Sequence, residues 1–215
     1  MVRDIPTHPL KHISIDGPVG TLKASLEEPL TPPRAVVLCL HPHPLHGGTR
    51  QNNVVRYGAL GALKASCVAL RLDFRGVGDS AGNYDEGVGE KEDAYAACLW
   101  LRERYKELPL FIWGFSFGSR VGLDLAIQLR EELQGFIAIA WPTNIYDWPS
   151  SPLWPLKTAF IFGSDDEYVD PSKMEHVKHF DGKICLINDA SHFFPQHLNE
   201  VRDFTFEYIQ EFLNA

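Results

Sequence analysis

The residue that most directly suggests chemistry in this chain is a serine between two glycines. The motif Gly-Phe-Ser-Phe-Gly (114–118) follows an apolar run at 110–113 and precedes a segment with helical apolar spacing. In a sharp strand-to-helix turn, the hydroxyl of Ser116 is pushed into the open. The flanking glycines are needed because strand and helix cross too closely for a Cβ. The N-terminus of the helix favours negative charge beside that oxygen, so the stretch predicts a serine nucleophile.

A serine nucleophile needs a base to take its proton, and the base needs a carboxylate to orient it. After a turn of this kind, the acid comes next along the chain and the histidine follows it. His192 lies in the loop after the last expected strand and is the expected base. Asp166 is the expected acid, because it follows a strand and Val169 can anchor its loop in the core. Asp165 is the alternative acid.

The negative oxygen formed during acyl transfer needs two backbone N–H donors. One is expected from Phe117, directly after the nucleophile, and the other from the loop after the apolar run at 35–40. That loop begins His-Pro-His-Pro (41–44), and proline has no N–H to donate. The second donor is therefore expected to be His43, with Leu45 as the next choice.

Three histidines in this loop also allow a metal site, since imidazole is the commonest zinc ligand. They are His41, His43 and His46, and no cysteine or carboxylate lies close in sequence to complete a ligand shell. We therefore expect them to form hydrogen bonds that shape the loop, with no metal and no cofactor. The charged residues of the glycine-rich turn at 73–80 are expected to be structural: Asp73, Arg75 and Asp79.

Strands and helices that would position these residues alternate along the chain. Continuous apolar runs predict buried parallel strands at 35–40, 66–72, 110–113, 136–140, 158–162 and 184–187. Helices are expected between them, near 53–65, 89–105, from the serine turn to about 133, and 171–179, before a closing helix. Two short strands at 11–15 and 21–26 form a hairpin. The pattern predicts one α/β domain over 1–215, a mostly parallel central sheet with helices on both faces.

The composition excludes several classes of function. The 215 residues have a net charge of −8 and a pI near 5.5, which argues against a nucleic-acid partner or an anionic membrane surface. Residues 1–6 contain no apolar segment, so no signal peptide is expected, and no run is long enough to span a membrane. All four cysteines lie singly in apolar segments, which predicts free thiols and a cytoplasmic protein.

The segment at 141–157, rich in proline and aromatic residues, interrupts the alternation of strands and helices. It occupies the position where a lid is common but is too short for a helical one. We expect an open, shallow acyl site with a minimal lid, whose rim is formed by Trp141, Tyr146, Trp148 and Trp154. Such a site suits small soluble acyl esters better than long lipid chains, which would leave apolar surface in water.

From about residue 13 to its end, the chain resembles small bacterial α/β-hydrolases that have His-Pro-His-Pro before Gly-Gly. These are predicted esterases, similar to dienelactone hydrolases. The matching stretches are 41–49, 73–78, 114–118, 144–147 and 192–194. The resemblance implies the α/β-hydrolase fold and a triad of Ser116, Asp166 and His192. The chain departs from the pattern at Val169-Asp170-Pro171, where valine is usually followed directly by proline, and at His46, where an aromatic residue is common.

These observations favour a serine hydrolase that cleaves carboxylic esters of small-molecule substrates through an acyl-enzyme. The same triad serves thioesterases, peptidases or amidases, and acyltransferases, and the sequence does not separate them. A ligand-binding module on a hydrolase fold is a further alternative. The natural substrate and the oligomeric state do not follow from the sequence.

Overall fold

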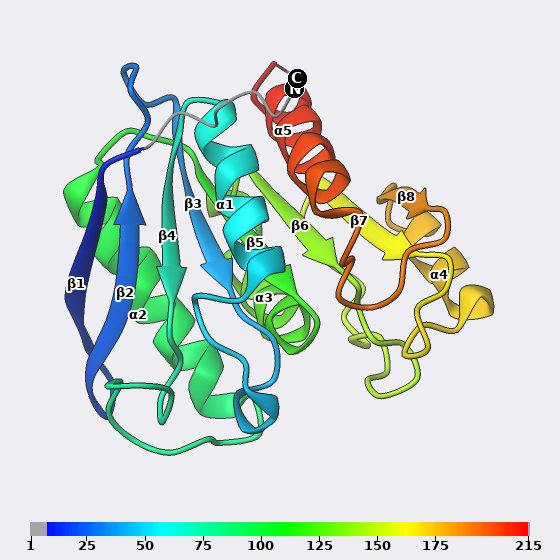
Figure 1. Ribbon diagram of the computed structural model, residues 1–215, viewed down its shortest axis with the longest axis horizontal. Helices are drawn as coiled ribbons and strands as arrows, with labels where there is room; N and C mark the ends of the chain where they lie inside the picture. The colour runs from blue at the N-terminus through cyan, green and yellow to red at the C-terminus, as the bar shows by residue number, and fades with distance from the viewer. Residues whose placement is uncertain (1–7, 215) are drawn as a thin grey trace.

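A single eight-stranded sheet forms the centre of the computed structural model, which describes residues 8–214 (Figure 1). Its strands lie in the order β1-β2-β4-β3-β5-β6-β7-β8. The first two pairings, β1 with β2 and β2 with β4, are antiparallel, and the others are parallel. The bounds are β1 (Leu10–Gly17), β2 (Gly20–Glu27), β3 (Ala35–Leu40), β4 (Cys67–Leu72), β5 (Leu110–Phe115), β6 (Gly135–Ile139), β7 (Thr158–Gly163) and β8 (Lys183–Ile187).

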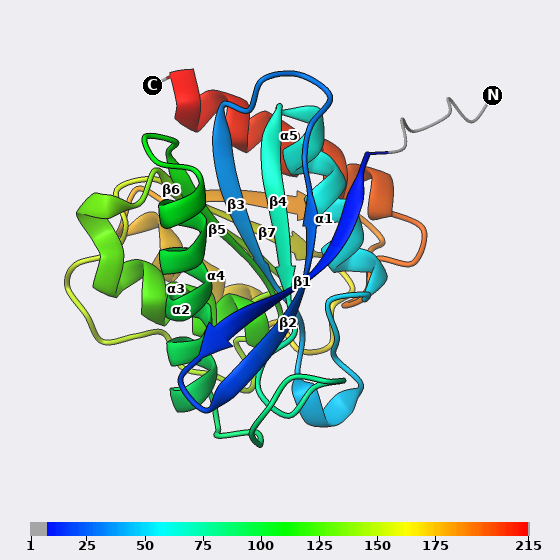
Figure 2. The same cartoon turned by 90° about the vertical axis from the view of Figure 1, so that its left-hand side faces the viewer.

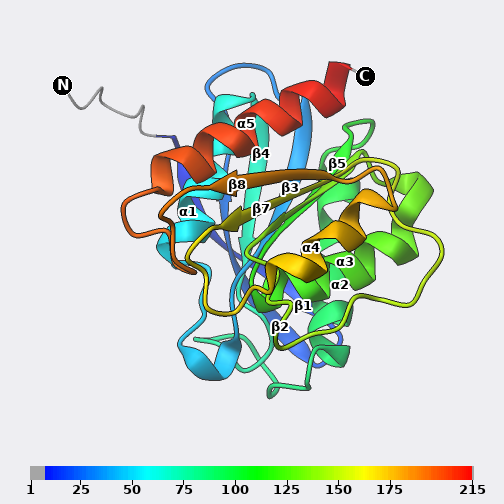
Figure 3. The same ribbon diagram turned by 90° about the vertical axis from the view of Figure 1, so that its right-hand side faces the viewer.

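Helices cover both faces of the sheet, as the alternation of elements predicts. α1 (Asn53–Lys64) and α5 (Leu198–Asn214) pack on one face, and α2 (Val88–Arg104), α3 (Phe117–Leu129) and α4 (Pro171–Lys178) lie on the other (Figures 1 and 3). Figure 2 looks onto the β1–β2 edge and shows how strongly these two strands are rotated against the rest of the sheet.

The central strands are apolar throughout because both of their faces are buried. In β3, Val36, Leu38 and Leu40 pack toward α2 and α3, while Val37 and Cys39 pack toward α1 and α5. Successive side chains of a strand point to opposite faces, so a strand covered on both sides needs an unbroken apolar run. The predicted fold class is confirmed.

Some boundaries differ from the sequence-based expectation. The helix after the serine turn ends at Leu129 instead of about 133, because the chain tightens into a 3₁₀ turn, η2 (Arg130–Glu132). Another 3₁₀ turn, η1 (Pro44–His46), lies in the His-Pro-His-Pro loop. The loops that follow β3, β5, β6, β7 and β8 lie together at the carboxyl ends of the parallel strands.

Three of the four cysteine thiols are buried and that of Cys185 is half-buried; all four are free. Within residues 8–214, no helix combines the length and the apolar character needed to cross a membrane. The expectation about a signal peptide concerns residues that lie outside this described part.

A buried ion pair fastens the turn at 73–80 to α2. The Arg75 guanidinium donates to both carboxylate oxygens of Asp93, and the backbone N–H of Arg75 donates to the same carboxylate at 2.8 Å. Asp93 is fully buried and Arg75 is 5% exposed. Next to Arg75, the Phe74 N–H donates to His41 Nε2, so this pair also anchors the His-Pro-His-Pro loop.

We predict that Asp93→Ala lowers the free energy of unfolding by about 3–5 kcal/mol, because it leaves a buried guanidinium without its main partner. Urea denaturation measures the loss. The matched control is Glu92→Ala, which removes an exposed carboxylate that contacts the same guanidinium at 3.2 Å. An exposed ion pair contributes less than about 1 kcal/mol. Equal losses in the two variants would contradict the role assigned to Asp93.

Candidate active site

Ser116 occupies the turn between β5 and α3 in a strained backbone conformation. Its φ is 53° and its ψ is −119°, a region that side-chain-bearing residues rarely adopt. The close crossing explains both glycines. A Cβ on Gly114 would lie 2.3 Å from the carbonyl oxygen of Gly118, and one on Gly118 would lie 2.5 Å from that of Leu40. The local sequence therefore folds into a sharp turn that presents a serine at the carboxyl end of the central strand β5.

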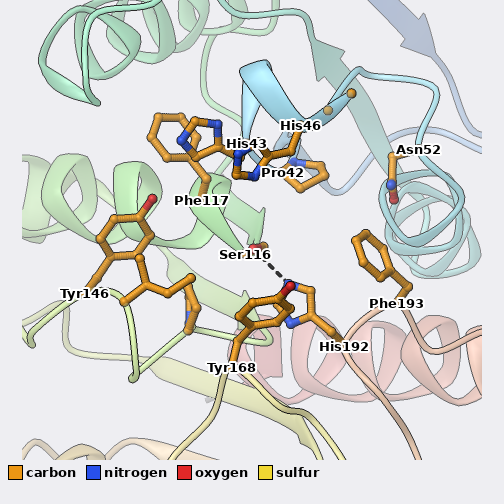
Figure 4. Close-up of a pocket in the computed structure, with 14 residues that line it drawn as sticks. Pro42, His43, His46, Asn52, Ser116, Phe117, Tyr146, Tyr168, His192 and Phe193 are labelled. Atoms are coloured by element: carbon orange, nitrogen blue, oxygen red, sulfur yellow. Dashed lines mark hydrogen bonds between the residues drawn. The ribbon is translucent and has the colours of Figure 1, made fainter.

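A continuous hydrogen-bonded chain joins the three residues that the sequence predicts as a triad. The Ser116 hydroxyl lies 2.9 Å from His192 Nε2, and His192 Nδ1 lies 2.8 Å from Asp166 Oδ2 (Figure 4). Because an ionised carboxylate only accepts, Nδ1 carries the proton and Nε2 is free to accept from the serine. His192 and Asp166 are 4% and 6% exposed, so this chain is shielded from water.

Asp166, and not its neighbour Asp165, reaches the histidine. The second carboxylate oxygen of Asp166 accepts the backbone N–H of Tyr168 at 2.9 Å. Asp165 is exposed, and its carboxylate accepts from the Ser164 hydroxyl. The departure from the family pattern at Asp170 is accommodated, since the N–H of Asp170 donates to the buried Thr143 hydroxyl at 2.6 Å. This bond ties the acid loop to the segment after β6.

The residues expected to donate backbone N–H groups, Phe117 and His43, line the same pocket as Ser116. Phe117 is the first residue of α3, and the first N–H groups of a helix have no acceptor within it. In the loop after β3, the Leu45 N–H already donates to His43 Nδ1 at 3.2 Å. Because the Leu45 N–H is already engaged, it is not free to bind a negative oxygen at Ser116. The N–H of His43 stays the predicted second donor.

Hydrogen bonds account for the ring nitrogens of two of the three loop histidines. His41 Nδ1 donates to the Pro42 carbonyl at 2.6 Å, while its Nε2 accepts from Phe74. His43 Nδ1 accepts from Leu45, and its Nε2 lies 3.2 Å from the Tyr84 hydroxyl. Within residues 8–214, no group of three or more His, Cys, Asp or Glu side chains is arranged to hold a metal ion. The hydrogen bonds of His41 and His43 hold the shape of the loop, as the sequence predicts.

The pocket beside Ser116 has a volume of about 290 Å³ and takes its walls from the loops after five strands. Its lining residues are Pro42, His43, His46, Gly47, Gly48, Asn52, Ser116, Phe117, Pro142, Ile145, Tyr146, Tyr168, His192 and Phe193. Of these, the sequence analysis missed the contributions of Asn52, Ile145, Tyr168 and Phe193 to the wall. Asn52 precedes α1, and its side chain also caps that helix. The position of Tyr168, two residues after the predicted acid, was the available signal.

Tyr146 lines the pocket as predicted, but the three tryptophans do not. Trp141 stacks on Trp148 with ring centroids 4.7 Å apart, and Trp154 stacks on Phe180 at 4.3 Å. All three also contact Phe160 of β7. The expected tryptophan rim is therefore wrong. The segment folds back onto the sheet beside α4, where large indole rings bury more apolar area than a rim position would allow.

Comparison with known proteins agrees with this geometry. The fold superposes with a TM-score of 0.88 on XC6422 from Xanthomonas campestris, described as an α/β serine hydrolase without lid, at 31% identity over 98% of this chain and 97% of that one. The chain belongs to the α/β serine hydrolases. Uncharacterized protein RP471 of Rickettsia prowazekii is 34% identical over 200 residues, 86% of this chain and 82% of that protein.

A more distant relative is the mouse lysophosphatidylserine lipase ABHD12. It is 31% identical over 157 residues, which are 71% of this chain but only 38% of that protein. No protein-family model matches the chain. The narrower resemblance to His-Pro-His-Pro esterases and dienelactone hydrolases therefore stays a prediction from the sequence.

The buried His41 imidazole generates a prediction about pH. Burial lowers the pKa of His41 from 6.5 to about 4. Below pH 6.5 the unfolded chain binds a proton on this ring, while the folded protein does not until about pH 4. Stability from this group is therefore complete above pH 6.5 and is lost as the pH falls toward 4, by about 3 kcal/mol.

The measurement is urea denaturation at several pH values for the wild type and His41→Gln, whose side chain has an amide oxygen for the Phe74 N–H. The other titrating groups contribute equally to the free energy of unfolding of both proteins, so their contributions cancel in the difference. The difference in free energy of unfolding between the two proteins should shrink between pH 6.5 and 4. A constant difference would contradict the buried, neutral state of His41.

Proposed function

We propose that the protein is a carboxylesterase that hydrolyses small acyl esters, with Ser116 as nucleophile, His192 as general base and Asp166 as the orienting acid. The observation that supports this most strongly is the unbroken hydrogen-bonded chain from the serine hydroxyl to the buried carboxylate. A purely structural role would not explain why these three side chains are joined in this order beside a pocket, whereas acyl transfer requires all three.

In the proposed mechanism, Ser116 Oγ attacks the ester carbonyl carbon while His192 Nε2 takes the hydroxyl proton. The carbonyl oxygen becomes negatively charged and accepts hydrogen bonds from the backbone N–H groups of Phe117 and His43. Collapse of this intermediate breaks the bond to the alcohol oxygen, which receives the proton from His192. Water then attacks the acyl-enzyme by the same route, and the acid and Ser116 are released.

The size of the pocket favours a short acyl group. About 290 Å³ is at the lower end of small-molecule sites, and the wall contains no helical lid to cover a long chain. The name of the mouse relative, a lysophosphatidylserine lipase, agrees with the kind of bond proposed for cleavage. Thioester or amide hydrolysis and acyl transfer would use the same residues, but no feature of the pocket favours them over esters.

We predict that Ser116→Ala and His192→Ala each lower kcat/KM for p-nitrophenyl butyrate by about 10⁴-fold, since each removes an indispensable part of one unit. Asp166→Asn is expected to lower it by about 10³–10⁴-fold because the imidazole loses its correct tautomer. The exposed residues Asp165 and His179 provide matched controls. Asp165→Asn and His179→Ala should retain activity, and a larger loss in Asp165→Asn than in Asp166→Asn would overturn the assignment of the acid.

The chain-length preference is a separate prediction. kcat/KM for p-nitrophenyl acetate or butyrate should exceed that for the palmitate by about tenfold or more. Methylenes beyond the pocket remain in water and gain none of the roughly 0.8 kcal/mol each that burial would give. The assay is run below the critical micelle concentration of each ester. A preference for palmitate would sink the idea of a short acyl site.

A further inference from the structure

The two ends of the pocket differ in chemistry. Figure 4 shows Tyr146 and Phe117 on one side of Ser116, and Asn52 and Phe193 on the other. Pro142 and Ile145 also line the pocket and lie beside Tyr146 in sequence, so that wall is apolar. The other side contains the amide of Asn52 and the ring of Phe193, and His46 with the two glycines after it lines the pocket between the two ends. An ester bound across Ser116 therefore meets an apolar surface at one end, while the other end adds the amide of Asn52 to the ring of Phe193.

The position of His192 indicates which end holds which part of the ester. The alcohol oxygen must receive a proton from His192 Nε2, so the leaving group lies on the histidine side of Ser116. In Figure 4, His192 lies in the same half of the site as Phe193 and Asn52. The acyl group then extends toward Tyr146, and the alcohol extends toward Asn52 and His46.

The amide of Asn52 has a donor to spare. Asn52 precedes α1, and its Oδ1 accepts the N–H of Val54 at 2.9 Å as the helix cap. That bond fixes which end of the amide is oxygen and leaves the Nδ2 group, with two N–H donors, for a ligand. Within residues 8–214, this nitrogen has no hydrogen-bond partner.

His46, whose side chain is exposed at the pocket wall above Ser116, offers a second polar group (Figure 4). Its ring stacks on that of His43, with centroids 4.5 Å apart and planes at 20°, which holds it against the wall. Among the described residues, neither ring nitrogen of His46 forms a hydrogen bond. A neutral imidazole has one donor and one acceptor, which suits a hydroxyl group.

The wall gives no support for a charged leaving group. Among the described residues that line the pocket, none is Lys, Arg, Asp or Glu. An anionic alcohol would lose water without gaining a cationic partner, and a wholly apolar one would displace water from the half-buried Asn52 amide without offering it an acceptor.

We propose that Asn52 and His46 form a subsite for the alcohol part of the ester, and that the preferred substrates are short acyl monoesters of a neutral polyol, such as glycerol. This inference rests on the proposed function, because the alcohol side is defined by proton transfer from His192. It adds the class of leaving group, which the triad alone does not specify.

The test compares two butyrate esters with the same carbon skeleton, glyceryl monobutyrate and propyl butyrate. We expect kcat/KM for the glyceryl ester to be about tenfold higher, the effect of one or two hydrogen bonds in a partly open site. Asn52→Asp keeps the oxygen that caps α1 but removes both donors, and Asn52→Ser keeps a capping oxygen that is too short to reach the ligand. Both variants should bring the ratio close to one.

Two further variants make the test sharper. His46→Phe keeps an aromatic ring to stack on His43 but removes its polar nitrogens, and should lower the ratio severalfold. Gln51→Ala alters the exposed neighbour of Asn52 and serves as the matched control, which should keep the full preference. Fluorophosphonate labelling of each variant measures whether Ser116 is still activated.

The outcomes separate this inference from the proposed function. Equal kcat/KM for the two esters in the wild type, or a preference that survives both Asn52 variants, overturns the polyol subsite while the esterase function stands. A preference for butyryl glycerol 3-phosphate over glyceryl monobutyrate also overturns it, since the leaving group would then be anionic. If neither these esters nor p-nitrophenyl butyrate is hydrolysed, the proposed function itself fails.

Discussion

The close crossing of β5 and α3 at Ser116 is the constraint on which the rest of the site depends. Ser116 has a φ of 53°. Gly114 and Gly118 let the backbones of β5, α3 and β3 approach so closely that a Cβ at either position would clash. The strain is maintained by the buried strands β3 and β5 and by the face of α3 that packs on them. One consequence is an exposed hydroxyl. Another is that the start of α3 lies against the loop after β3, so that Phe117 and His43 line the same pocket.

Around this crossing, every functional loop is held by polar contacts buried behind it. Arg75 and Asp93 fasten the turn at 73–80 to α2, and Phe74 in that turn holds His41. On the opposite side, Thr143 joins the loop that contains Asp166 to the segment after β6, which lines the pocket with Tyr146. The site thus combines a serine in a constrained turn with loops that are held by a few buried polar contacts, and substitutions far from Ser116 are expected to alter the pocket through them.

The fold, and the three side chains that the structure joins by hydrogen bonds, could be named from the sequence because each leaves a local signal. Buried parallel strands require unbroken apolar runs, the serine turn requires its glycines, and the order of acid and histidine follows from the topology. The pocket wall could not be predicted as well, because it depends on how irregular segments fold back. Trp141 and Trp154 were expected at the rim, but their large rings gain more by packing on β7. The position of Asn52 before a helix predicts that its side-chain oxygen caps α1, but not that the residue also lines the pocket.

The measurement that tests this account most directly is labelling with a fluorophosphonate, followed by intact-mass and peptide mass spectrometry. An activated serine oxygen displaces fluoride from phosphorus, and its proton passes to the adjacent histidine. The account predicts one phosphonyl group per chain, on Ser116, absent in Ser116→Ala and formed far more slowly in His192→Ala. Folded protein that remains unlabelled, or that is labelled at another residue, would contradict the claim that Ser116, His192 and Asp166 act as one catalytic unit.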